Sequence, residues 1–327
     1  MKIPLIDLHQ EQQDLIRDLH QALRDPGFIY VRNHGAPPQI SRDLMALAHR
    51  FFAMDQEFKD RIHMKRAGPA WRGWFPAGAE LTAGRPDLKE GLYFGTEHPA
   101  DHPMVQAGTL TFGQNQWPVG DEWQAFPVLV QDWMKAMQRV GETLLQLIAR
   151  GLQLPGGWFT ERFGTEPTCL FRIFSYPPGG NADEFGVGEH TDMGFLTMLL
   201  QDNSGGLEVC TADGRWIAAP PVPGTLLINI GDMLEYWTRG IYRATPHRVR
   251  NTGKSHRLSL PFFLDPGWQM SLRPIPESML PPESPGPGRQ RWDGLDLHRL
   301  GADTTYGQFV SDKIRGVFPW LAGSRPG

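Results

Sequence analysis

Apolar residues fall at helical spacing in two stretches of the first sixty residues. They are Leu15, Leu19 and Leu23 in the first stretch and Leu44, Leu47, Ala48, Phe51 and Phe52 in the second. Residues three and four apart share one face of a helix, so each stretch is predicted to form a helix with one buried face. With the short apolar runs before them, residues up to about 60 are expected to form strand, helix, strand and helix.

The longest predicted helix lies between Asp121 and Leu154. Its apolar positions are Val130, Trp133, Met134, Met137, Val140, Leu144, Leu145 and Ile148. A stripe of this kind is typical of a helix that packs against a sheet in the core. The stretch from Lys65 to His102, in contrast, is rich in Gly, Pro and aromatic residues and has no steady period.

From Cys169 to Leu264 the pattern changes to short apolar strands separated by turns. The turns are marked by Gly179-Gly180, Gly205-Gly206 and Asp213-Gly214. Many short strands between such turns are typical of a jelly roll. The predicted fold class is α+β but mainly β, with a double-stranded β-helix (jelly roll) core flanked by helices.

We divide the chain into four parts. They are an N-terminal α/β region at 1–120, a long helix with its connection at 121–165, the catalytic β-helix core at 166–270, and a C-terminal loop and helix at 271–327. In the last part, Pro281 to Gly288 is a Pro/Gly-rich loop, either a cover or a surface excursion. The closing helix is expected from Thr305 to Phe318.

Composition excludes several classes of protein. The net charge is −4 and no basic run is present, so nucleic acid is not an expected partner. No apolar stretch reaches the ~20 residues that span a bilayer, and the first residues, Met1-Lys2-Ile3-Pro4, do not resemble a signal peptide. The only two cysteines, Cys169 and Cys210, are expected to be thiols, which indicates a cytoplasmic protein. The sequence does not indicate an oligomeric state.

One pattern points to chemistry: His190-Thr191-Asp192 followed by His247. Two imidazoles and one carboxylate on one face of an octahedral ion form the facial triad of non-haem Fe(II) oxygenases. Residues i and i+2 of a strand point the same way, so His190 and Asp192 can share an ion while Glu189 and Thr191 face away. The spacing alone is weak, since chance gives about 0.7 such pairs in a chain like this.

Two rivals for the metal are disfavoured. His9-Gln10-Glu11 precedes a helical pattern, and residues i and i+2 of a helix lie about 200° apart. His256 competes with His247 for the third position. It lies next to Arg257, and strand alternation puts Arg257, Ser259 and Phe263 on one face and His256 on the other. We therefore favour His247.

Arg257 and Ser259 indicate a second binding group. An Arg that points inward is costly to bury unless it meets an anion, and its planar fork suits a carboxylate. A Ser hydroxyl two residues further on can donate to the same group. An internal salt bridge is the alternative. The metal pattern upstream favours a dicarboxylate cosubstrate.

With these residues the chain resembles the isopenicillin-N-synthase-like branch of Fe(II)/2-oxoglutarate dioxygenases. The resemblance covers nearly the whole chain and is carried by Ile3–Leu8, Gly27–Gly35, Tyr176-Pro177-Pro178, the His190/Asp192 block, Ile228–Asp232, Arg257-Leu258-Ser259 and Thr305–Phe309. The Thr82–Asp87 stretch is similar to bacterial members, including ethylene-forming enzymes.

The resemblance implies roles for individual residues. His190, Asp192 and His247 fall on the iron ligands, and these are also the predicted catalytic residues. Arg257 and Ser259 fall on the residues that hold the distal carboxylate of 2-oxoglutarate, and Tyr176 on an aromatic position that helps to bind it. Many plant members have Asn two residues before that Tyr, where this chain has Phe174.

The predicted function is a non-haem Fe(II)- and 2-oxoglutarate-dependent oxygenase. With O2 it would oxidise a C–H bond of a small molecule by hydroxylation, desaturation or cyclisation, releasing succinate and CO2. The alternatives are an Fe(II) oxidase of the same fold that does not use 2-oxoglutarate, an ethylene-forming-type enzyme, and a binding module without activity. Expected substrate contacts, together with Trp71, are Arg72, Trp74, Phe94, Phe195 and Phe263.

Overall fold

The computed structural model describes residues 2–82, 84–179, 185–250, 253, 255–282, 301 and 303–317. The α-helices are α1 (Gln12–Arg24), α2 (Pro38–Phe52), α3 (Gln56–Asp60), α4 (Pro103–Gln106), α5 (Phe126–Gly151), α6 (Trp158–Phe163), α7 (Asp232–Trp237) and α8 (Tyr306–Val317). Within these residues, the 3-10 helices are η1 (Met64–Ala70), η2 (Asp121–Trp123) and η3 (Glu277–Met279).

The strands form two sheets and a small hairpin. In chain order they are β1 (Leu5–Asp7), β2 (Phe28–Arg32), β3 (Gly73–Phe75), β4 (Leu81–Thr82), β5 (Arg85–Pro86), β6 (Glu90–Gly95), β7 (Thr168–Tyr176), β8 (Phe185–His190), β9 (Leu196–Gln201), β10 (Leu207–Cys210), β11 (Trp216–Ala218), β12 (Thr225–Ile230), β13 (His247–Arg250) and β14 (Arg257–Asp265). The larger sheet has the order β1-β2-β12-β9-β14-β7-β6-β3 and the smaller one β11-β10-β13-β8. Strands β4 and β5 pair with each other.

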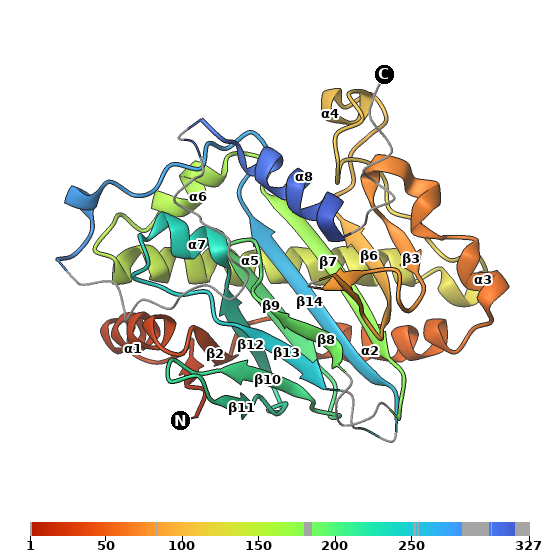
Figure 1. Ribbon diagram of the computed structural model, residues 1–327, viewed down its shortest axis with the longest axis horizontal. Helices are drawn as coiled ribbons and strands as arrows, with labels where there is room; N and C mark the ends of the chain where they lie inside the picture. The colour runs from red at the N-terminus through yellow and green to blue at the C-terminus, as the bar shows by residue number, and fades with distance from the viewer. Residues whose placement is uncertain are drawn as a thin grey trace.

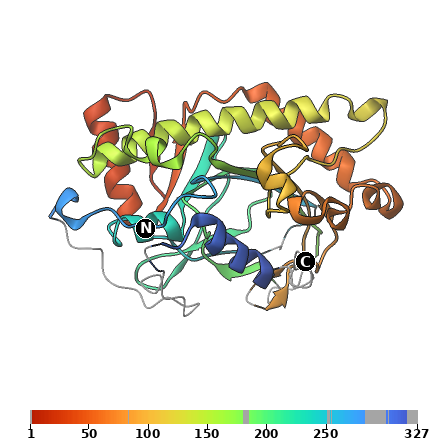
Figure 2. The same ribbon diagram turned by 90° about the horizontal axis from the view of Figure 1, so that it is seen from above.

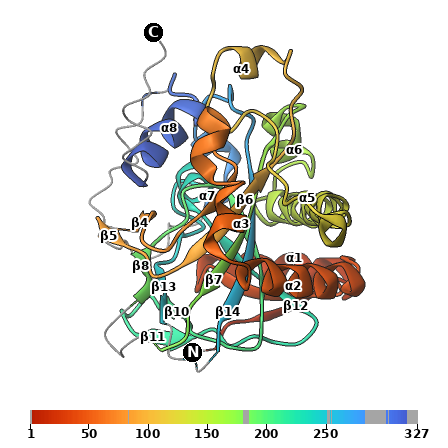
Figure 3. The same ribbon diagram turned by 90° about the vertical axis from the view of Figure 1, so that its right-hand side faces the viewer.

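The two sheets and the helices form layers. Helices α1, α2 and α5 cover one face of the larger sheet, and the smaller sheet and α8 lie on the other side (Figures 1 and 2). The same arrangement is seen from the side in Figure 3. Apart from the parallel pair β1–β2, the strand pairs in both sheets are antiparallel. This is the predicted double-stranded β-helix, with helices on its outer face.

The helices predicted from apolar spacing are present. Helix α1 begins after Glu11, whose carboxylate accepts hydrogen bonds from the backbone N–H groups of Gln13 and Asp14. These bonds satisfy donors that have no partner within the helix. Helix α5 is the long helix expected between Asp121 and Leu154, and its apolar stripe packs against β7, β9 and β14.

The stretch from Lys65 to His102 is more ordered than its pattern suggests. It supplies β3 and β6, which extend the larger sheet, and the β4–β5 hairpin. Strand β6 shows no alternation because Leu92, Tyr93 and Phe94 are all buried, one face against the core and the other toward the cavity side. A strand covered on both faces has no polar side to mark it in the sequence.

Other predicted boundaries shift. Strand β13 begins only at His247, and β12 is followed directly by α7. The closing helix is α8, but Phe318 lies outside the described residues, as does most of the predicted Pro281–Gly288 loop. In the described part of the chain, no helix is both long and apolar enough to cross a membrane.

Candidate active site

A cavity of about 290 Å³ lies between the two sheets. This is at the small end of ligand-binding pockets. Inward-facing residues of β7 and β14 line one side, and residues from β8 and β13 line the other. Because alternate residues of a strand face the same way, β7, β13 and β14 contribute every second side chain. The β-helix core therefore forms most of the cavity, and residues before it, such as Trp71 and Lys89, and residues of α8 complete the lining.

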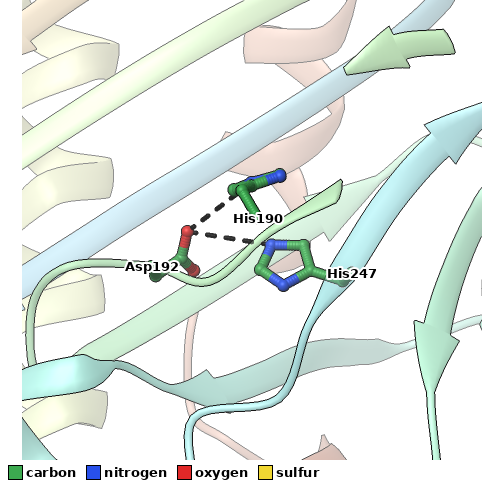
Figure 4. A group of neighbouring side chains, drawn as sticks. All are labelled: His190, Asp192 and His247. Atoms are coloured by element: carbon green, nitrogen blue, oxygen red, sulfur yellow. Dashed lines mark ion pairs between the residues drawn. The ribbon is translucent and has the colours of Figure 1, made fainter. Parts of the chain in front are cut away.

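Three side chains that could hold a metal ion meet in this cavity. His190 ends β8, Asp192 follows two residues later, and His247 begins β13 and pairs with His190 in the smaller sheet. Asp192 Oδ1 lies 3.7 Å from His247 Nε2 and 4.0 Å from His190 Nε2, and one donor atom of each residue lies within 4.8 Å of the others (Figure 4). Among the described residues, this is the one group of three or more His, Cys, Asp or Glu that could hold a metal ion.

The expected local geometry needs one correction. Asp192 lies beyond the last residue of β8, so strand alternation does not place it. Thr191, expected to face away, also lines the cavity. Both residues lie in the segment that follows β8, and both line the cavity.

Both imidazoles are held in the orientation that a metal requires. His190 Nδ1 donates to the carbonyl of Gly188 at 2.8 Å, and His247 Nδ1 donates to the carbonyl of Thr245 at 3.1 Å. A carbonyl oxygen can only accept, so each Nδ1 carries the proton and each Nε2 keeps its lone pair. Hydrogen bonds of this kind fix the tautomer and the ring orientation of metal-binding histidines.

The carboxylate of Asp192 is fixed in the same way. Its Oδ2 accepts hydrogen bonds from Thr197 Oγ1 at 2.5 Å and from Asn229 Nδ2 at 2.7 Å. Thr197 is on β9 and Asn229 on β12, and the two are paired neighbours in the larger sheet. With Oδ2 bound on that side, Oδ1 is left facing the two histidines. Neither Thr197 nor Asn229 was predicted to have this role.

The protonation states suit a cation. Burial and the nearby His247 ring lower the pKa of His190 to about 4, against the attraction of Asp192. Burial would raise the pKa of Asp192, but His247, His190 and the hydrogen bonds from Thr197 and Asn229 bring it below its ordinary value. At neutral pH a neutral imidazole therefore lies beside an ionised carboxylate, which is the state that binds a divalent metal.

A buried guanidinium faces the same cavity from the larger sheet. Arg257 is 2% exposed; its Nε donates to the carbonyl of Gly205 at 2.6 Å and its Nη2 to Gln201 Oε1 at 3.4 Å. Its Nη1 has no hydrogen-bond partner among the described residues. A buried charged donor without a partner is costly, so this atom marks a place for an anion. The donor set fits a carboxylate.

Neighbouring residues complete the Arg257 side. Ser259 also faces the cavity, two residues further along β14. The ring of Tyr176, opposite Arg257 in the β7–β14 pair, lies 4.8 Å from the guanidinium carbon. Phe174, where many plant members have Asn, lines the cavity too. The three residues predicted to bind the cosubstrate are thus brought together.

The disfavoured metal candidates are remote from this group. His256 is exposed, and its Nδ1 lies 3.3 Å from Ser175 Oγ, on the face of β7–β14 opposite to Arg257. His9 lies in the turn before α1, and Glu11 caps that helix. The strand-alternation argument that separated His256 from Arg257 is confirmed.

The expected substrate contacts are corrected in four of six cases. Trp71 and Phe263 line the cavity, but Arg72, Trp74, Phe94 and Phe195 do not. Arg72 donates to the Thr111 carbonyl at 2.5 Å, and Trp74 Nε1 donates to Glu90 Oε2 at 2.8 Å.

The two phenylalanines are also part of the core. The Phe94 ring stacks at 5.1 Å on Trp117, and Phe195 packs edge-on at 4.8 Å against Trp237. Phe94 follows Tyr93 on β6 and therefore points to the helix-covered face of the sheet. Aromatic content alone could not separate these packing roles from contact with a ligand.

Sequence reasoning missed a set of buried charged residues in the cavity lining. They are Glu80, Lys89 and Arg172, with Asp87 in contact with Lys89. Three of the four lie in the stretch that showed no period. Charged residues at buried positions of a strand, such as Arg172 in the apolar run of β7, were the available signal.

Comparison with known proteins agrees with this geometry. Residues 167–266 match the 2OG-Fe(II) oxygenase superfamily, and residues 3–120 match the N-terminal region described for the non-haem dioxygenase in morphine synthesis. A Dictyostelium discoideum protein named as a probable iron/ascorbate oxidoreductase is 37% identical, over 98% of this chain and 96% of its own.

Two further relatives extend the comparison. The 2-oxoglutarate-dependent dioxygenase citB of Monascus ruber is 32% identical over 84% of this chain and 87% of its own. The crystal structure of a 2OG-Fe(II) oxygenase family protein from Caulobacter crescentus has a TM-score of 0.79 and 27% identity, covering 96% of this chain and 98% of that one. On these similarities over most of its length, the chain belongs to the 2OG-Fe(II) oxygenase superfamily.

Proposed function

We propose that His190, Asp192 and His247 hold one Fe(II) and that Arg257 and Ser259 hold the far carboxylate of 2-oxoglutarate beside Tyr176. The observation that carries this is the pairing of two features in one cavity. Two histidine donors lie on the smaller sheet with the Asp192 donor just beyond it, and a buried guanidinium nitrogen with no partner among the described residues lies on the larger sheet. A 2-oxoglutarate molecule has a keto acid end for the metal and a second carboxylate for the Arg.

The chain is an enzyme of this superfamily, with Fe(II), 2-oxoglutarate and O2 as its cofactor and cosubstrates. When bound, Fe(II) with 2-oxoglutarate supplies the oxidising chemistry, in which the cosubstrate becomes succinate and CO2 and one oxygen atom of O2 oxidises the substrate. The residues of the chain orient these groups. Asn229 and Thr197 aim Asp192, and two backbone carbonyls aim the histidines.

The reaction would oxidise a C–H bond of a small molecule. A cavity of about 290 Å³ that also holds 2-oxoglutarate leaves room only for a small substrate. Phe174, Phe263 and Trp71 supply apolar lining that keeps water away from the reacting groups. Hydroxylation, desaturation and cyclisation all require this arrangement.

A turnover screen tests the proposal. The Fe(II)-loaded protein is supplied with 2-oxoglutarate, O2 and a library of small metabolites, and both O2 consumption and succinate formation are followed. We expect at least one compound to stimulate both, with one succinate formed per substrate oxidised. Protein that binds Fe(II) but never forms succinate would refute the dependence on 2-oxoglutarate.

One second candidate follows from Arg257. The same guanidinium could hold a carboxylate of the substrate itself in an Fe(II) oxidase that does not use 2-oxoglutarate. The relative named as a probable iron/ascorbate oxidoreductase supports this candidate, because that name does not include 2-oxoglutarate. Substrate oxidation without succinate would select it, whereas ethylene released from 2-oxoglutarate would indicate an ethylene-forming type.

We also propose a cytoplasmic location. Cys169 and Cys210 form no disulfide in the structure. A cytoplasmic enzyme keeps its thiols reduced. Fractionation of the source cells would test the location, and recovery of the protein outside the cytoplasm would contradict it.

A further inference from the structure

The cavity contains buried charges that neither the iron site nor the 2-oxoglutarate site uses. Glu80, Lys89 and Arg172 line it, and Asp87 contacts Lys89. The side chains of Glu80, Asp87 and Lys89 are 7%, 3% and 3% exposed, and that of Arg172 is 13% exposed. Charged groups are buried this deeply only when they are paired or when they bind something.

Lys89 is the centre of this group. Its Nζ lies 2.7 Å from Glu80 Oε2, contacts Asp87 Oδ2, and lies 4.7 Å from the centre of the Phe174 ring. Burial alone would lower the pKa of Lys89. The carboxylates of Glu80 and Asp87 raise this pKa by more than burial lowers it, so the ammonium group stays charged. One cation therefore serves two carboxylates, and Asp87 is also held by Thr82 at 3.0 Å.

Both carboxylate oxygens of Glu80 already have a partner within the chain. Its Oε2 is paired with Lys89, and its Oε1 accepts a hydrogen bond from the Tyr93 hydroxyl at 2.6 Å. Arg172 Nη1 approaches the same Oε1, but only to 3.7 Å. Within this group of four, the two acids and two bases cancel formally, so the group itself has no net negative charge with which to attract a cationic substrate.

Arg172 is the member of the group with a donor left over. Its Nε is buried and makes no hydrogen bond to any residue that the structure describes. The guanidinium carbon lies 4.3 Å from the centre of the Tyr93 ring, 4.8 Å from Phe263 and 5.1 Å from Trp71. These rings fix the plane of the guanidinium. An aromatic ring is not a conventional hydrogen-bond acceptor, so they do not satisfy the Nε donor. An unmet charged donor on the wall of a cavity indicates an anionic or carbonyl ligand.

We propose that Lys89 determines substrate specificity. It neutralises Glu80 and Asp87, so this wall of the cavity does not bind cations, and Arg172 is left to bind a carboxylate of a small organic acid. This inference deepens the proposed function and rests on it, because it takes the cavity as the substrate site of the oxygenase. The carboxylate belongs to the substrate, since Arg257 serves the cosubstrate.

Paired probes of opposite charge test the proposal. The protein is loaded with Mn(II) and saturated with 2-oxoglutarate without oxygen, so that Arg257 is occupied and nothing turns over. Calorimetry then measures the binding of isovalerate against isoamylamine, benzoate against benzylamine, and phenylacetate against phenethylamine. We expect at least one carboxylate to bind about tenfold more tightly than its amine, the effect of one charge-assisted hydrogen bond.

Substitutions then identify the residues responsible. Arg172→Met should remove the carboxylate preference, about tenfold, without changing 2-oxoglutarate binding. Lys89→Met leaves one uncompensated acid and should move the preference about tenfold toward the amine. In Glu80→Gln/Lys89→Met the wall is neutral again, and the preference for the carboxylate should return.

The proposal is overturned if the wild type prefers no carboxylate in the panel, if Arg172→Met keeps the carboxylate preference, or if Lys89→Met leaves the ratio of carboxylate to amine affinity unchanged. Should Lys89→Met fail to fold, Glu80→Gln alone must raise carboxylate affinity, and an unchanged affinity overturns the proposal equally. Failure of the wild type to bind 2-oxoglutarate is a separate result, which would refute the proposed function instead.

Discussion

Replacing Arg257 by Lys separates a cosubstrate-binding role from a structural one. The guanidinium makes two contacts within the chain, at 2.6 Å from Nε to Gly205 and 3.4 Å from Nη2 to Gln201, and its Nη1 is left for a ligand. Lysine keeps the charge but has no fork, so it cannot present two parallel donors to a carboxylate. A structural Arg would lose only its contacts to Gly205 and Gln201.

The size of the effect follows from the lost hydrogen bond. A charge-assisted hydrogen bond in a buried site contributes about 1.5–3 kcal/mol, so 2-oxoglutarate should bind Arg257→Lys roughly tenfold or more weakly. Arg257→Ala removes the charge as well and should bind more weakly still. Metal binding should hardly change in either variant, because both histidine donors come from the smaller sheet whereas Arg257 lies on the larger one.

The assay is calorimetric titration of 2-oxoglutarate into Mn(II)-loaded protein without oxygen. Arg248→Lys is a matched control: Arg248 pairs with Glu208 at 2.6 Å on the smaller sheet and does not line the cavity. Equal affinity in wild type, Arg257→Lys and Arg257→Ala would show that Arg257 only supports the Gly205 turn. Equal loss in Arg248→Lys would show a general effect on the fold.

Three further predictions concern the metal donors and their surroundings. Asn229→Ala should weaken Fe(II) binding about tenfold, as expected when a residue that orients a ligand is lost; unchanged affinity in equilibrium dialysis would mean that Asp192 needs no such support. His190→Ala should abolish stoichiometric Fe(II) binding and His256→Ala should not, and the reverse result would refute the choice of ligands. Burial raises the pKa of Asp265 to about 6. The protonated carboxyl therefore stabilises the fold fully below about pH 4, and about 3 kcal/mol of the free energy of unfolding is lost as the pH rises to about 6. Urea unfolding of the metal-free protein from about pH 4.5 to 7 should show this loss in the wild type but not in Asp265→Asn, and an equal pH dependence in both would contradict the assignment.

The sequence was sufficient for features that depend on local pattern. Helical spacing located α1, α2 and α5, and strand alternation correctly put Arg257, at the start of β14, on the opposite side from His256, the residue before it. These predictions succeed because the period of a helix or strand is set by the backbone alone. The division of the chain into four parts stays a prediction.

Features that depend on tertiary packing could not be predicted. Phe195 and Phe263 look alike in sequence, yet one packs on Trp237 and the other lines the cavity. Lys89 and Glu80 lie nine residues apart around the β4–β5 hairpin, and only the folded chain brings their charges to 2.7 Å. Without the fold, a Lys and a Glu in a polar stretch are indistinguishable from surface residues.

The most direct test of the account is a crystal structure of the protein with Fe(II) and 2-oxoglutarate, prepared without oxygen. We expect an anomalous iron peak between Nε2 of His190, Oδ1 of Asp192 and Nε2 of His247. We also expect the far carboxylate of 2-oxoglutarate to be bound by Nη1 of Arg257 and the hydroxyl of Ser259. An iron peak at His256, or a 2-oxoglutarate carboxylate bound at Arg172 with Arg257 left without a ligand, would contradict it.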